Sequence, residues 1–115
     1  MVNEHNNANY RSVIDGVEIK TTVYGKDTLM SKFSMKKDHK LPSHNHPDYE
    51  QTGYLLEGRI ILTIGGTAYD MKPGDSWCIE KGVEHMAEIL EDSVVLEVFS
   101  SPREDYVKLL DPKSR

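Results

Sequence analysis

The stretch His44-Asn45-His46-Pro47-Asp48-Tyr49-Glu50-Gln51 decides how the rest of the sequence is interpreted. Side chains on an extended chain alternate between two faces, so histidines two residues apart point to the same side. Both imidazole rings can therefore reach one ion, and neutral imidazole binds Zn, Ni, Fe, Mn or Cu. Taken alone, the pair fits a structural role about as well as a metal site, so the rest of the chain has to distinguish the two.

The segments on both sides of this stretch are short and stop at turn residues. Asp15–Gly16 between two apolar segments is typical of a β-hairpin, and the β-branched segment Ile60–Ile64 stops at Gly65–Gly66. No helical period appears before Pro102, and only residues 103–110 could form a helix. The pattern predicts an all-β sandwich or barrel with a short C-terminal helix. The predicted strands are Val13–Ile14, Val17–Ile19, Thr21–Tyr24, Leu29–Met35, Tyr54–Leu56, Ile60–Ile64, Ala68–Met71, Ser76–Ile79, Val83–Leu90 and Val94–Phe99, with a turn at Glu91–Asp92.

The length of 115 residues fits one domain, and 37% hydrophobic residues can form a core. Residues 1–9 are polar and rich in asparagine, so we expect a flexible N-terminal tail there. The domain is then expected over residues 10–110, with a short C-terminal tail over residues 111–115.

Charge and apolar content argue against several classes of protein. The formal charge is −5 with no Lys/Arg cluster, which argues against nucleic-acid binding. No stretch approaches the roughly 20 apolar residues of a membrane span. Cys78 is the only cysteine, so no intramolecular disulfide can form, and we expect a cytoplasmic protein. An anionic substrate would need local positive charge in its site, because the net charge repels it at long range.

A third histidine, His85, follows Gly74 and Gly82. With this histidine and these glycines added to the His44–His46 pair, the chain resembles the cupin superfamily. Its first motif has two histidines, then an acid or amide followed seven residues later by glycine, as in Gln51 to Gly58; its second motif matches Gly74, Gly82 and His85. The resemblance implies a double-stranded β-helix, or jelly-roll barrel, with one divalent metal ion bound by three histidines. These ligands are His44, His46 and His85.

The fourth metal ligand has two candidates. Glu50 would neutralise charge on the ion, whereas Gln51 has the cupin spacing to Gly58. Adjacent residues on a strand face opposite ways, so only one of them can bind, and we favour Gln51. A neutral ligand leaves the ion a stronger Lewis acid and anion binder. The ligand set accepts Ni, Zn, Mn or Fe.

Glu97 lies in the middle of the apolar segment Val94–Phe99. A buried carboxylate without a partner costs several kcal/mol, so Glu97 requires a salt bridge, an edge position that reaches water, or a chemical role. The chemical role would be a general acid/base with a raised pKa, lining a pocket on the same face as Phe99. The sequence leaves these alternatives open.

The spacing Glu97-x-Phe99-(three)-Arg103 resembles the C-terminal signature of small pectin-degradation cupins of the KdgF type. These proteins linearise 4,5-unsaturated monouronates. The resemblance implies that Glu97, where the family usually has Asp, transfers a proton and that Arg103 holds a small anionic substrate. Phe99 and Tyr54 are strand aromatics, which pack in cores more often than they bind ligands; we include them as candidate substrate contacts. Small cupins of this kind commonly pair, so a homodimer is expected.

Two other functions stay open at this stage. A cupin site also supports oxygen chemistry, as in an iron-dependent dioxygenase, and fold alone does not choose between reactions. The protein could also be a metal-dependent small-molecule binder without turnover. Because of the resemblance to the KdgF-type cupins, we favour over these two alternatives a metal-dependent reaction on a small sugar acid, of the lyase or isomerase kind.

Overall fold

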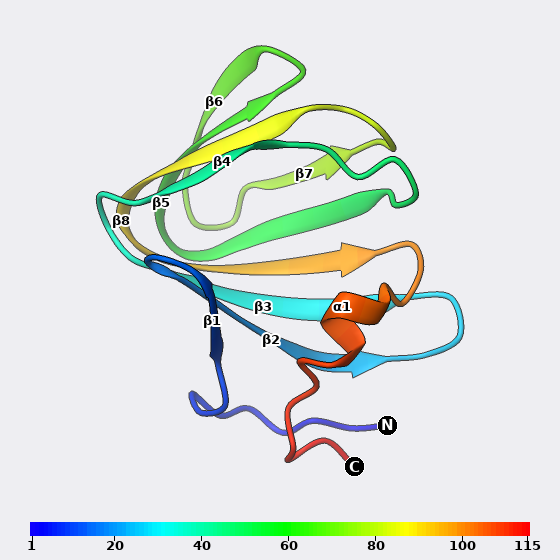
Figure 1. Cartoon of the computed structure of the whole chain (residues 1–115). Helices are drawn as coiled ribbons and strands as arrows, with labels where there is room; N and C mark the ends of the chain where they lie inside the picture. Colours follow the sequence, from blue (N-terminus) through cyan, green and yellow to red (C-terminus); the bar gives the residue numbers. More distant parts are fainter.

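The computed structural model describes residues 1–115 as one antiparallel sheet of eight strands that curls into a barrel, followed by one short helix (Figure 1). The strand order is β1-β2-β3-β8-β5-β6, with β4 added on β8 and β7 added on β5. This architecture confirms the predicted all-β fold. The elements are β1 (Arg11–Ile14), β2 (Val17–Tyr24), β3 (Leu29–Met35), β4 (Lys40–His44), β5 (Gln51–Ile64), β6 (Thr67–Met71), β7 (Ser76–Ile79), β8 (His85–Phe99) and α1 (Glu104–Val107).

Strand β8 runs unbroken through the place where the sequence predicts a turn, at Glu91–Asp92. Its first part pairs with β4 and its last part, from Ser93 onward, pairs with β3. Figure 1 shows the strand bending between these two partners. The acidic residues lie exposed at the bend, which explains why they resemble a turn in the sequence.

Strand β5 likewise joins two predicted segments, Tyr54–Leu56 and Ile60–Ile64, into one. The ladder with β8 shifts register on both sides of Gly58, which has a φ of 93°. A Cβ atom there would collide with the side chain of Ser93, so the close approach and the left-handed backbone both require glycine. The bulge changes which residues face inward. Odd-numbered positions are buried before it and even-numbered positions after it.

The interior of the barrel is filled by alternate residues of the strands. Strand β3 follows the predicted half-buried pattern, with every second residue from Leu29 to Met35 buried. Strand β8 buries every second residue from Ser93 to Phe99, while its other face is half-buried rather than fully buried. The main core cluster consists of Val17, Ile19, Phe33, Met35, Leu55, Ile60, Leu62, Met71, Trp77, Ile79, Ala87, Ile89 and Val95.

The C-terminal helix is shorter than the predicted range of residues 103–110. It ends at Val107, because the following residues bond to β2 instead of continuing the helix. Leu110 forms a parallel bridge with Thr21, and the Asp111 backbone N–H donates to the Thr21 carbonyl at 2.8 Å. No helix of the protein is long and apolar enough to cross a membrane.

The two termini lie together, and a buried ion pair joins them to the sheet (Figure 1). Lys20 of β2 is 1% exposed, and its Nζ lies 3.2 Å from the carboxylate of Asp111. Asn6 and Asn9 donate to the same carboxylate at 2.9 and 2.7 Å. Residues 1–9, expected to be a free tail, are therefore held against the C-terminal segment by contacts that their polar composition does not reveal.

This cluster should contribute strongly to stability. Asp111→Ala leaves the Lys20 ammonium buried without its counter-ion, so the free energy of unfolding should fall by about 3–5 kcal/mol in urea titrations. Asp70→Asn is the matched control, because Asp70 pairs with Arg59 in an exposed ion pair and should matter little. Equal stability of the two variants would contradict the stabilising role of the buried Lys20–Asp111 ion pair.

The same carboxylate should make stability depend on pH. Burial raises the pKa of Asp111, but hydrogen bonds from Asn6, the Lys113 backbone and Asn9 together lower it below its ordinary value. Its contribution is therefore full above the unfolded-state pKa of about 3.9 and is lost as the pH falls through the lower folded-state pKa. Asp111→Asn should reduce the difference in stability between neutral and acidic solution.

Candidate metal centre

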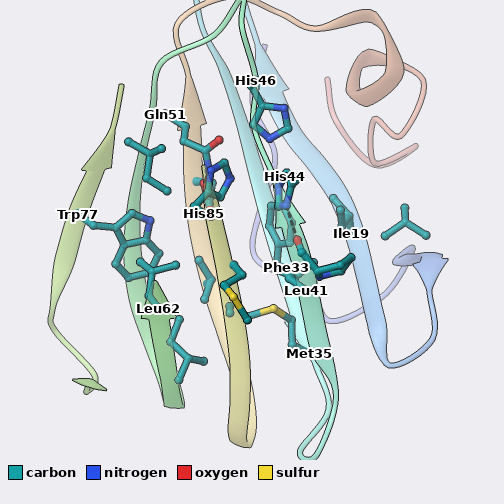
Figure 2. Close-up of a pocket in the computed structure, with 18 of the residues that line it drawn as sticks. Ile19, Phe33, Met35, Leu41, His44, His46, Gln51, Leu62, Trp77 and His85 are labelled. Carbon is teal, nitrogen blue, oxygen red and sulfur yellow. Dashed lines mark hydrogen bonds between the residues drawn. The ribbon is translucent and has the colours of Figure 1, made fainter. Parts of the chain in front are cut away.

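Three histidines from distant parts of the chain meet at one end of the barrel. The register of β4 with β8 places His44 opposite His85, and His46 follows two residues after His44. One nitrogen from each ring lies within 4.8 Å of the other two. Figure 2 shows the three rings gathered around a common space. The structure thus brings together the three ligands expected from the sequence.

Backbone contacts orient two of these rings. The Nδ1 atoms of His44 and His85 lie 2.7 and 3.0 Å from the carbonyl oxygens of Pro42 and Val83. A carbonyl only accepts, so each Nδ1 carries the proton and each Nε2 keeps its lone pair. The Nε2 of His85 is buried and has no hydrogen-bond partner. A buried acceptor of this kind fits a metal ligand.

The electrostatics favour neutral imidazole, the form that binds metal. Burial lowers the pKa of His46 to about 4, and the positive charge of Arg103 adds to the effect. Burial also lowers the pKa of His85. The residues present therefore fit one transition-metal ion, with a donor set that suits Zn, Ni, Mn or Fe.

Gln51, rather than Glu50, faces the histidines. Gln51 is 5% exposed and its Oε1 is buried without a partner, whereas Glu50, the residue just before β5, is exposed. The amide Nε2 of Gln51 donates to Oε2 of Glu97 at 2.5 Å. The geometry therefore fits Gln51 as the fourth ligand and links it to the buried carboxyl.

Glu97 sits in the interior on a central strand, which excludes the edge-strand alternative. Burial raises its pKa to about 8, against the opposing effects of the Gln51 hydrogen bond and the Arg103 charge. No salt bridge reaches it, because Arg103 pairs with Asp105 instead. The carboxyl can therefore hold or release a proton near neutral pH beside the histidines.

Arg103 is also buried, at the N-terminus of α1, and its guanidinium is held on several sides. Its Nε and Nη2 donate to the Asp105 carboxylate at 2.9 and 2.6 Å. Its guanidinium carbon lies 3.7 Å from the Tyr106 ring centroid, with Phe99 and Tyr49 at 5.0 and 5.2 Å. The remaining Nη1 is buried without a hydrogen-bond partner, so it keeps a donor that an anion could accept from. Sequence reasoning missed these supporting residues, although the acidic run after Arg103 was a signal for Asp105.

A cavity of about 210 Å³ adjoins the histidines. Gln51, Glu97 and Phe99 line it, together with apolar side chains from the barrel interior such as Phe33 and Leu62 (Figure 2). Phe99 is thus positioned as expected. Tyr54 is not: it is 44% exposed and points away from this cavity, beside Leu96 and Val98. Its neighbours Gly53 and Leu55 face inward, so strand alternation already requires Tyr54 to face outward.

Fold and site together define the class of protein. The family model Cupin_2, described as Cupin domain, matches residues 31–101, and the chain therefore belongs to the cupin family. It resembles the pectin degradation protein KdgF of Dickeya dadantii (strain 3937), with 28% identity over 94 residues that cover 81% of this chain and 86% of the relative.

Solved structures show the same fold. The structure of KdgF from a Halomonas species superimposes with a TM-score of 0.87 at 24% identity, covering 91% of this chain and 96% of the other. An RmlC-like cupin from Shewanella frigidimarina NCIMB 400 gives a TM-score of 0.80 at 22% identity, covering 84% and 86%. The chain is a small cupin that resembles KdgF.

Elemental analysis of purified protein should find about one divalent transition-metal ion per chain, because three neutral imidazoles converge on one point. His46→Ala and His85→Ala should each remove most of this metal. His5→Ala is the control, since His5 is exposed near the N-terminus and should leave the metal content unchanged. Full metal content in either site variant would rule out the proposed ligand set.

Proposed function

We propose that this cupin binds one divalent transition-metal ion through His44, His46, His85 and Gln51 and linearises 4,5-unsaturated monouronates. The observation that carries the proposal is the contact between Gln51 and Glu97, which sets a proton-holding carboxyl beside a candidate metal ligand. The similarity to the pectin degradation protein KdgF supports this choice of substrate class.

The reaction is an isomerisation that needs no redox partner. The C1 hydroxyl of the cyclic uronate loses a proton, the bond between C1 and the ring oxygen breaks, and C4 gains a proton to give the open keto form. Glu97 carries the proton that is transferred, because its raised pKa suits both accepting and donating near neutral pH. The bound ion supplies Lewis-acid polarisation of substrate oxygens.

Arg103 binds the substrate carboxylate through its free Nη1 edge. Its bidentate pair with Asp105 and the stacked rings fix the direction of this edge before the substrate arrives. The chain carries a net charge of −5, so this guanidinium and the ion provide the positive charge that an acid needs.

The cavity size supports a single sugar ring as substrate. Its volume is about 210 Å³, whereas an engineered cavity of about 150 Å³ holds benzene. A monouronate is therefore of the right order of size, and a pectin or alginate chain is too large. The substrate is the product of an enzyme class that cleaves such polymers by elimination.

The metal-loaded protein should consume unsaturated monouronates, followed as loss of the enol absorbance. Glu97→Gln should lower kcat by about 10²–10⁴-fold with little change in KM, because acid–base catalysis is lost while binding remains. Glu91→Gln is the control, because Glu91 lies exposed on the same strand. Binding of monouronates without turnover would contradict the enzymatic role and favour a binding protein.

Arg103→Ala should mainly raise KM, because it removes the group that holds the substrate carboxylate. Glu97→Asp tests whether the longer side chain is adapted to this site. One methylene moves the carboxyl by about 1.5 Å, so a site adapted to Glu should lose about a hundredfold in rate with Asp. A gain in rate with Asp would show that the site is not adapted to Glu.

We also propose that the protein forms a homodimer. Strands β1 and β6 end the sheet order, and unpaired strand edges tend to find partners. The exposed Tyr54 and Leu56 on β5 add apolar surface. Sedimentation at micromolar concentration should give twice the chain mass of 13.1 kDa, and a species of only 13.1 kDa would refute the dimer.

A further inference from the structure

Trp77 is the only tryptophan of the chain. It lies on β7 and lines the cavity, and its indole nitrogen has no hydrogen-bond partner. The residue is 8% exposed, and its Nε1 is buried without a hydrogen-bond partner. Figure 2 shows the indole ring pointing inward from β7. A buried indole N–H normally finds an acceptor, so its isolation calls for an explanation.

The strand register explains how the ring reaches its position. Trp77 of β7 pairs with Gly53 of β5, and Gly53 pairs with Glu97 of β8, so the three residues form one row across the sheet. A Cβ atom on Gly53 would collide with the edge of the indole that carries Nε1. The missing side chain therefore lets the N–H edge lie over Gly53, in the row that leads to Glu97.

Four buried side-chain polar atoms of the protein lack a partner, and three of them have a role in the proposed reaction. In the proposed function His85 Nε2 and Gln51 Oε1 bind the ion, and Arg103 Nη1 binds the substrate carboxylate. The fourth atom is Trp77 Nε1, which has no role in the proposed reaction as described so far. Its position on β7 is separate from the α1 segment that follows Arg103, so the two unpartnered donors belong to different elements of the structure.

We propose that Trp77 is a specificity-determining residue whose indole N–H donates a hydrogen bond to a hydroxyl oxygen of the bound sugar acid. The inference rests on the proposed function, because it takes the ligand to be a monouronate. The donor distinguishes sugars that place a hydroxyl at this point from analogues that lack it, since an analogue would leave the buried N–H unpaired. Gly53 is required because any side chain would displace the ring.

The single tryptophan makes the contact directly observable. In the Zn²⁺-loaded protein, ¹H–¹⁵N spectra contain one indole N–H signal, and saturating D-glucuronate should shift it downfield and slow its exchange with solvent.

Trp77→Phe keeps most of the ring and removes the N–H, so it should raise the Kd of D-glucuronate about five- to tenfold. The KM for unsaturated monouronates should rise similarly with kcat little changed. Ile89→Val, at a buried core position of β8 that does not line the cavity, is the control for packing and should leave both constants near their original values.

The outcomes separate this inference from the proposed function. If D-glucuronate binds but the indole signal and its exchange do not change, Trp77 makes no contact and the inference is wrong while the function stands. Unchanged Kd and KM in Trp77→Phe lead to the same conclusion. If no monouronate binds or reacts, the proposed function fails and the inference fails with it. The spectra need only the original protein, so the test holds even if Trp77→Phe does not fold.

Discussion

The antiparallel pairing of β5 with β8 is the contact on which the site depends. These two strands supply Gln51, His85 and Glu97, and their register sets which side chains meet in the interior. Strand β4 adds His44 across from His85, and β7 adds Trp77 across from Gly53. A slip of one residue would turn all of these side chains to the outer face, because strand alternation has a period of two.

Local side-chain contacts explain why polar groups can be tolerated inside an apolar barrel. A buried carboxyl and a buried guanidinium are costly, and the protein offsets this cost by local contacts: the Gln51 amide for Glu97, and the Asp105 carboxylate with three rings for Arg103. The four buried side-chain atoms left without partners belong to residues of this one region. These are the atoms that the proposed function pairs with an ion and a polar ligand.

Much of this arrangement follows from local rules. The period of two predicts that His44 and His46 share a face, that Glu97 faces inward with Phe99, and that only one of Glu50 and Gln51 faces the ion. The same rule, applied to Gly53–Leu55, predicts that Tyr54 faces outward. Tyr54 was therefore wrongly included among the candidate substrate contacts. Other features depend on contacts between distant residues. The Gln51–Glu97 hydrogen bond and the Lys20–Asp111 ion pair join residues 46 and 91 positions apart, and the bend in β8 is set by two different partner strands. Such contacts cannot be predicted from the pattern of neighbouring residues in the sequence.

The central claim is that the three histidines and Gln51 hold one metal ion beside Glu97, and anomalous diffraction from crystals grown with Zn²⁺ tests it most directly. The account predicts one strong anomalous peak at about 2.0–2.1 Å from Nε2 of His44 and His85 and from one ring nitrogen of His46, with Gln51 Oε1 as the remaining protein ligand. A map without a peak at this point, or with ions only on surface carboxylates, would contradict it.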